Sequence, residues 1–235
     1  MTDQQPLTEQ MFHCGHSRAE LALLGESRWG IKHLTWFVSS YPLGSGMTKE
    51  QIDAVIVRSC GNWSRVCGLT FSRAATLESA NIRISTVRGR RGGGDGKLGM
   101  LAFCYLPTGQ NFNGSLDLVF DGDEDWEDDP NGNGIEMENV LTHELGHGIG
   151  QSHTNIQRQL MNPVYSRQIR VPQSNDIRVA VDSYGPPSSL PAPTPTPPPL
   201  PPSGGQVKAK VEISGQVYGG YLSLLSGAAK VEFNE

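Results

Sequence analysis

The sequence lacks several features that would assign it to a broad class of protein. Among its 235 residues no apolar run reaches the length of about eighteen residues that crosses a bilayer, so we expect no membrane span. The first residues, MTDQQPLTEQ, contain no basic segment followed by an apolar one, so no secretory signal is visible. Basic residues are in the minority, and the net charge of −5 argues against nucleic acid as a partner.

Cysteine is scarce, and motifs for covalent catalysis are missing. The four cysteines, Cys14, Cys60, Cys67 and Cys104, are too few and too irregularly spaced for a disulfide framework or a zinc ribbon. The cysteines therefore do not decide between an oxidising and a reducing compartment. No GxSxG-type nucleophile motif occurs, which leaves a covalent mechanism without support from the sequence.

Proline, by contrast, is concentrated in one place. Ten of the sixteen prolines lie in residues 186–202, a run that favours extended polyproline geometry and cannot build a core. We interpret this run as a stiff linker between a folded domain and a short C-terminal appendage that is either β-structured or incomplete.

The chain before the linker shows the alternation of an α+β domain. Thr48 and Gln51 form a capping-box pattern at the start of a helix that we expect to end at Gly61. The strands are predicted at residues 33–38, 69–71, 81–85, 99–105 and 115–120, and two further helices at 136–149 and 174–184. This order indicates a mixed sheet covered by helices.

Residues 143–153 read HELGHGIGQSH, which is a zinc-binding pattern. Histidines four apart on a helix project from one face, so His143 and His147 can reach the same ion. Gly150 allows the chain to turn, which brings His153 round as a third ligand. Single histidines are usually surface or core residues, but this combination favours one zinc ion with an open coordination position, as in catalytic sites.

Glu144 lies beside these ligands and is the predicted catalytic residue. Zinc lowers the pKa of its bound water from about 15.7 towards 7 and polarises a carbonyl, while Glu144 can accept the proton and pass it to the leaving amine. We therefore predict a metalloendopeptidase. A catalytically silent zinc- and calcium-binding interaction module is the alternative, and the presence of Glu144 favours the enzyme.

With the zinc motif and LMNPVY after it, the chain resembles the matrixins, a branch of the metzincin zinc endopeptidases. SRWGIKHLTW, NWSRVCGLTF and NDIRVAVDSYG resemble further family segments, so that the likeness covers residues 28–185. It implies a twisted, five-stranded mixed sheet with three helices, and a substrate extended beside residues 99–105. It also implies that Met161 lies beneath the zinc ligands, and that Pro163 and Tyr165 line the pocket for the residue after the cut.

The resemblance gives the acidic segment a second interpretation. Residues 121–129 contain seven acids in nine positions, which is typical of a solvated loop. However, FDGDEDW and DGKLGMLA are similar to two family segments that hold a structural calcium ion. This implies Asp95, Asp121 and Glu124 as calcium ligands, since calcium prefers several carboxylate and carbonyl oxygens.

A second zinc ion, which matrixins usually carry, is not expected. The family binds it through three histidines and an aspartate, and at the matching places this chain has Arg91, Gly93, Phe103 and Val119. None of these side chains is a zinc ligand. We therefore predict one zinc ion per chain.

Near the N-terminus, FHCGHSR resembles the latency segment PRCGxPD of the family. This implies that the Cys14 thiolate occupies the open zinc position of a zymogen. His13 and Arg18 replace the flanking residues that support this switch, so an ordinary cysteine is the alternative.

Together these features divide the chain into four parts. We predict a propeptide remnant at 1–27, the catalytic domain at 28–185, the linker at 186–205 and the appendage at 206–235. By family resemblance we expect protein or peptide substrates, a monomer, and secretion to the extracellular matrix, although no signal peptide is visible.

Overall fold

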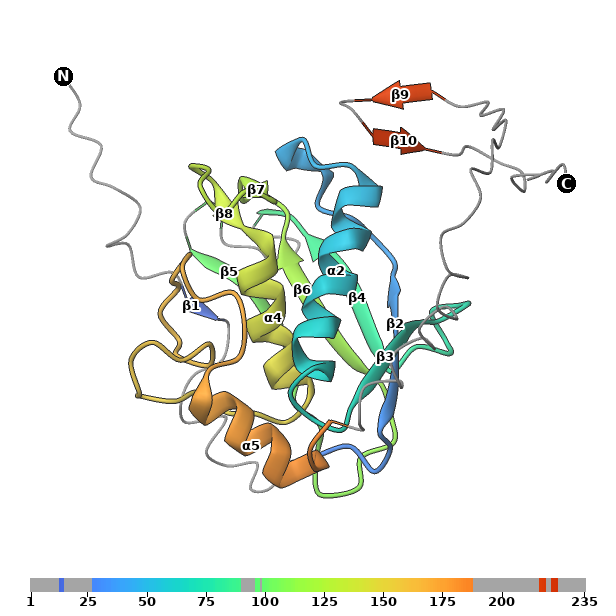
Figure 1. The fold of residues 1–235 in the computed structure, drawn as a ribbon, viewed down its shortest axis with the longest axis vertical. Coiled ribbons are helices and arrows are strands. Elements are labelled where there is room, and N and C mark those ends of the chain that lie inside the picture. The colour runs from blue at the N-terminus through green and yellow to red at the C-terminus, as the bar shows by residue number, and fades with distance from the viewer. Residues whose placement is uncertain are drawn as a thin grey trace, which may run out of the picture. The chain divides into compact units, whose positions relative to one another are not determined.

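The computed structural model describes residues 13–14, 27–89, 96–97, 99–187, 216–218 and 221–223 (Figure 1). The chain forms two compact units, Met1–Leu190 and Pro191–Glu235. In the second unit the described residues form an antiparallel pair, β9 (Gln216–Tyr218) and β10 (Tyr221–Ser223). Within the described ranges, no helix is long and apolar enough to cross a membrane. The division of the chain into four functional parts stays a prediction.

The first unit is built on a mixed sheet. Its five main strands are β2 (His33–Val38), β3 (Thr70–Arg73), β4 (Ile82–Val87), β5 (Met100–Cys104) and β6 (Leu116–Asp121). They follow the order β5-β6-β4-β2-β3, and only β5 runs antiparallel to its neighbour β6. A two-residue strand, β1 (His13–Cys14), pairs in parallel with the outer side of β5.

Three α-helices accompany the sheet: α2 (Lys49–Ser64), α4 (Met137–Gly148) and α5 (Ser174–Tyr184). Figure 1 shows α2 and α4 side by side against one face of the sheet, with α5 beyond the end of α4. The predicted α+β fold, with a five-stranded mixed sheet and three helices, is confirmed.

The smaller elements differ more from expectation. The predicted strand 33–38 is confirmed as β2, and the ends of the other four predicted strands are shifted by one or two residues. Besides β1, three short elements had no clear sequence pattern. These are the 3-10 helix Leu43–Ser45 and the parallel pair β7 (Trp126–Glu127) and β8 (Ile135–Glu136). Strand β8 leads directly into α4, so it fixes the point at which this helix begins.

Helix α2 begins as predicted and ends later. The Thr48 hydroxyl accepts a hydrogen bond from the Gln51 amide, and the Gln51 side chain accepts one from the Thr48 amide. The prediction that Gly61 ends the helix is wrong, because α2 continues to Ser64. The Trp63 indole donates to the Thr142 carbonyl of α4 at 2.8 Å, and this contact stabilises the last turn against a glycine penalty of about 1 kcal/mol.

The core lies between the sheet and the paired helices α2 and α4. Strand residues such as Leu34, Ile82 and Leu118 are fully buried there, as are Ile56 and Trp63 of α2. The three described cysteines, Cys60, Cys67 and Cys104, are buried within this apolar region. Burial raises the pKa of the Cys60 thiol to about 12, so it behaves as a neutral packing residue.

Candidate active site

Helix α4 carries the site; its start is capped locally, and its end is held by distant parts of the chain. At its start, the Glu136 carboxylate accepts a hydrogen bond from the Asn139 amide at 2.8 Å. At its end, the Gly148 carbonyl accepts one from the Trp29 indole, and the Ile149 carbonyl accepts one from the Tyr184 hydroxyl. These contacts satisfy groups that a helix leaves open at its ends, so the helix is fixed in position.

The three histidines predicted as zinc ligands lie together. Nitrogens of His143, His147 and His153 that could bind a metal are all within 4.8 Å of one another. The Nε2 atoms of His147 and His153 are 3.1 Å apart. Tetrahedral zinc, with Zn–N bonds of about 2.0–2.1 Å, holds its ligand atoms about 3.3 Å apart. The donor set therefore fits a single zinc ion.

Backbone carbonyls orient two of these rings. Nδ1 of His143 donates to the Leu160 carbonyl at 2.6 Å, and Nδ1 of His147 donates to the Gln151 carbonyl at 2.7 Å. A carbonyl oxygen only accepts, so in both rings the proton is assigned to Nδ1. The neutral rings then keep the Nε2 lone pair for a metal, which is the arrangement that stabilises metal-binding histidines.

The turn after α4 delivers the third histidine. Gly150 has a φ of 93°, and its amide donates to the His147 carbonyl at 2.8 Å. A Cβ atom at this position would lie only 2.0 Å from the Ser27 carbonyl oxygen. The turn therefore requires glycine for two reasons, the left-handed backbone conformation and the close approach of Ser27. The turn reverses the chain, so that His153 reaches the other two rings.

Met161 packs directly against the same helix. Its sulfur lies 2.3 Å from the position that a Cβ atom on Gly146 would occupy. The Asp176 carboxylate of α5 accepts hydrogen bonds from the amides of Leu160 and Met161, at 2.8 and 3.3 Å. Sequence reasoning missed this role of Asp176, for which the only signal was its place in the first turn of a predicted helix.

Glu144 lies at a small cavity beside the histidines. Its side chain is buried, and together with His143 it lines a cavity of about 30 Å³. The predicted pocket residues Pro163 and Tyr165 line the same cavity, as does Leu101 of β5. The structure thus brings the zinc ligands, the predicted catalytic carboxylate and the predicted pocket residues into one place.

The comparison with known proteins agrees with this geometry. The sequence model of the family described as Matrixin matches residues 28–185. The chain belongs to the matrixin family. Matrixins are zinc endopeptidases, so this is a family of proteolytic enzymes.

Curated relatives cover the same part of the chain. Karilysin from Tannerella forsythia is 33% identical over 174 residues, which are 73% of this chain and 36% of karilysin. Stromelysin-1 from Rattus norvegicus is 34% identical and covers 71% of this chain and 35% of its own length. Matrix metalloproteinase-16 from Homo sapiens is 32% identical, over 75% of this chain and 30% of its own length. The chain therefore spans about a third of the length of these matrixin relatives.

The predicted matrixin calcium ligands are only partly described. Asp121, the last residue of β6, and Glu124, in the loop after it, are both buried, and Asp121 accepts a hydrogen bond from the Asp123 amide at 2.8 Å. Asp95 lies outside the described residues, so the complete ligand set stays a prediction. Buried carboxylates require compensating charge or donors, and the Asp123 amide supplies one donor to Asp121.

At the positions of the usual second matrixin zinc, the structure shows apolar side chains. Phe103 of β5 and Val119 of β6 are directly opposite each other in the sheet. The Phe103 ring also packs edge-on against Tyr105, with 5.5 Å between ring centroids. Arg91 and Gly93 lie outside the described residues.

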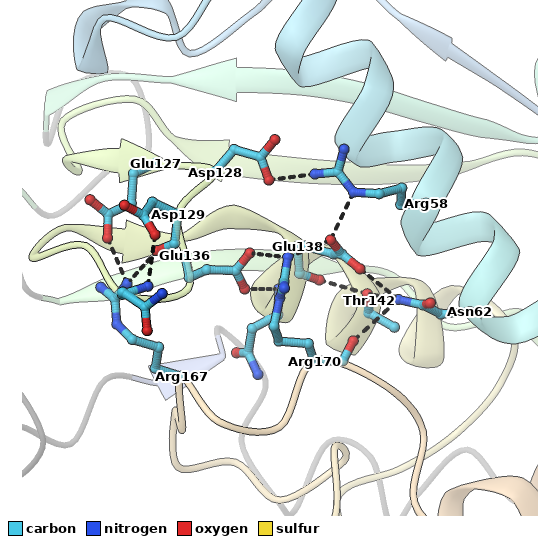
Figure 2. Close-up of polar contacts among 12 residues, drawn as sticks. Arg58, Asn62, Glu127, Asp128, Asp129, Glu136, Glu138, Thr142, Arg167 and Arg170 are labelled. Atoms are coloured by element: carbon cyan, nitrogen blue, oxygen red, sulfur yellow. Dashed lines mark hydrogen bonds and ion pairs between the residues drawn. The ribbon is translucent and has the colours of Figure 1, made fainter. Parts of the chain in front are cut away.

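A second group of acids, Asp128, Glu136 and Glu138, is occupied by arginines. Arg58 bonds to Asp128 and Glu138, and Arg170 bonds to Glu136 and Glu138 (Figure 2). Burial raises the pKa of Glu136 despite the nearby arginine. This matrixin therefore has an ionic cluster at the start of α4, and no sequence pattern indicated its long-range pairs.

The turn at Gly150 yields a direct prediction. Gly150→Ala should lower the free energy of unfolding by about 2 kcal/mol or more, because it combines an unfavourable positive φ with a clash at Ser27, and it should lower zinc content. Chemical denaturation and metal analysis measure both effects. Gly46→Ala is the matched control, since Gly46 also has a positive φ, of 86°, but open space around it. Equal losses in the two variants would contradict the role of the Ser27 contact.

Proposed function

We propose that this matrixin chain is a zinc-dependent endopeptidase that hydrolyses peptide bonds in proteins, with Glu144 as general base and acid. The observation that carries this proposal is the cluster of three histidine donors, one of which, His143, lines a cavity together with the buried Glu144. His143, His147 and His153 would hold the zinc ion. Their separation and the orientation of two rings by carbonyls support this assignment.

The chemistry divides between the metal and the protein. A zinc ion held there would polarise the scissile carbonyl and make a water molecule acidic enough to react near neutral pH. Glu144 would accept the proton from that water and donate it to the departing amine, so no covalent intermediate with the protein is required. The outer side of β5, whose Leu101 lines the cavity, would align an extended substrate through backbone hydrogen bonds once β1 has left it.

Around this domain we propose the arrangement that the sequence suggests. Residues 1–27 would be a propeptide remnant, 186–205 a linker and 206–235 an appendage. The substrates would be proteins outside the cell, and the catalytic domain would act as a monomer. Calcium held by Asp95, Asp121 and Glu124 would stabilise the loop after β6, and the burial of the last two carboxylates supports this proposal.

The central test removes the charge of Glu144. Glu144→Gln should lower kcat/KM on casein or gelatin by about 10²–10⁴-fold, because general acid–base catalysis contributes about that much. Metal analysis should find one zinc ion per chain in both proteins. Glu78→Gln, an exposed substitution, should leave the rate unchanged, and a zinc chelator should abolish it. Equal cleavage by wild type and Glu144→Gln would overturn the mechanism, and two zinc ions per chain would overturn the single site.

Calcium binding predicts a change in thermal stability. Removing calcium should lower the melting temperature of the wild type, since a ligand present at about 100 times its Kd stabilises a protein by about 2.7 kcal/mol. Asp121→Asn should show the lower melting temperature with or without calcium. Asp182→Asn, an exposed change on α5, serves as control and should keep the calcium response. If the melting temperature of the wild type does not change when calcium is removed, the acidic segment is a solvated loop and not a calcium site.

We also propose that Cys14 restrains activity. The backbone pairing of β1 with β5 supports this proposal, because β1 then lies along the strand that would align the substrate. Cys14→Ser should raise the basal rate on the order of tenfold, as expected when a largely blocked site is released. The measurement compares initial rates at equal zinc content. An unchanged rate would remove the latency switch.

A further inference from the structure

His153 differs from the other two proposed zinc ligands in the part of the fold that carries it. His143 and His147 belong to α4, which is buried along its whole length. His153 lies in the chain between α4 and α5, where the described residues form no helix or strand (Figure 1). The residues 155–158 that follow it are all exposed. We refer to residues 153–158 as the ligand loop, and its position has to come from contacts with another segment.

The backbone of the ligand loop is bonded to the segment that contains Met161. The Thr154 amide, directly after His153, donates to the Met161 carbonyl at 2.9 Å. Inside the loop, the Ile156 amide donates to the Thr154 hydroxyl at 3.2 Å. The Met161 amide is itself bonded to the Asp176 carboxylate of α5. The loop therefore rests on a segment that α5 holds in place.

The side chain of Asn162 adds a second attachment. Its amide nitrogen donates to the Ile156 carbonyl at 3.3 Å and to the Thr154 carbonyl at 3.5 Å. An amide nitrogen carries two hydrogens, so one side chain can serve both carbonyls. Its oxygen accepts a hydrogen bond from the Val164 amide at 3.0 Å, which fixes the orientation of the side chain. Thr154, the neighbour of His153, is thus held through both its amide and its carbonyl.

The ligand loop needs such contacts because its backbone is strained. Arg158 has a φ of 59°, and in the described part of the chain it is the only residue other than glycine with a positive φ. This conformation is unfavourable for residues with a Cβ atom, and it persists where surrounding contacts determine the path of the chain. An exposed loop has no core of its own to supply those contacts. The hydrogen bonds from Asn162 and Met161 supply them instead.

We propose that Asn162 is a positioning residue that holds His153 at the zinc ion and thereby sets how tightly the metal is bound. This inference rests on the proposed zinc site. Without the Asn162 amide, the ligand loop leaves its strained conformation more often, and His153 is withdrawn from the other two rings. Residues that orient a metal ligand from outside the coordination sphere change metal affinity by about 10- to 100-fold. Asn162 also lines the cavity beside Glu144, and a role confined to that cavity would change catalysis but not zinc affinity.

The test measures the zinc Kd of the full chain by competition with a chromophoric chelator, so the result does not depend on activity. Asn162→Leu keeps the approximate size of the side chain and removes its hydrogen bonds to Thr154, Ile156 and Val164. The zinc Kd of this variant should rise by about 10- to 100-fold. Asn155→Leu is the matched control, since Asn155 is an exposed asparagine in the same loop, and its Kd should stay within about twofold of the wild type.

A second measurement asks whether Asn162 acts through His153. In a His153→Ala background this ligand is already lost, so adding Asn162→Leu should change the zinc Kd by less than about twofold. In a His143→Ala background His153 can still bind, and Asn162→Leu should again raise the Kd by about tenfold or more. A general loss of stability would weaken zinc binding equally in both backgrounds. If Asn162→Leu does not fold, Asn162→Ala replaces it, because that variant also lacks the amide.

The outcomes separate this inference from the proposed function. A wild type that binds no zinc overturns the proposed function and this inference together. A wild type that binds zinc but cleaves neither casein nor gelatin overturns the endopeptidase proposal alone, and the Kd values still decide the role of Asn162. The inference alone is overturned if Asn162→Leu binds zinc within about twofold of the wild type, or no more weakly than Asn155→Leu. The same conclusion follows if its loss of affinity persists in full in the His153→Ala background.

Discussion

Helix α4 is buried on every side, and all twelve of its residues are shielded from solvent. A helix in such a place is normally apolar, but half of these residues are polar or charged: Glu138, Asn139, Thr142, His143, Glu144 and His147. A buried polar group without a partner costs several kcal/mol, so each neighbouring element has to supply donors, acceptors or charge. Much of the remaining structure can be understood as meeting this requirement.

The partners that α4 obtains also give the site its geometry. Carbonyls of Leu160 and Gln151 satisfy two histidine rings and set their tautomers, while Asp176 holds the segment that contains Leu160 and Met161. At the other end of the helix, Asn139 bonds to the carbonyls of Ser166 and Ile169, and Glu138 pairs with arginines. Metal site and pocket are therefore two ends of one supported helix, and such support holds reactive groups in a fixed arrangement.

The parts of the protein that could be predicted from sequence are those with local causes. The HELGH spacing, the Thr48 cap and the alternating strands each depend on residues close together in the chain. Gly61 was misjudged because a contact between helices overrides its intrinsic preference. The hydrogen bonds of Asn139 to the Ser166 and Ile169 carbonyls span up to 30 residues, and no periodicity in the sequence predicts them. Two-residue strands such as β7 are too short to leave a pattern.

The contacts at the end of α4 have a consequence for how the protein is made. Trp29 bonds to Gly148 and to Tyr184 across separations of 119 and 155 residues. Contacts so distant in sequence form late, because a long loop must close before any stabilisation is gained. The two histidines on α4 are arranged as soon as the helix forms, but His153 follows a turn that rests on the start of the domain. The Leu160 carbonyl that orients His143 is in turn held by Asp176 of α5, so a nascent chain would complete the support of its zinc site only after α5 has been synthesised.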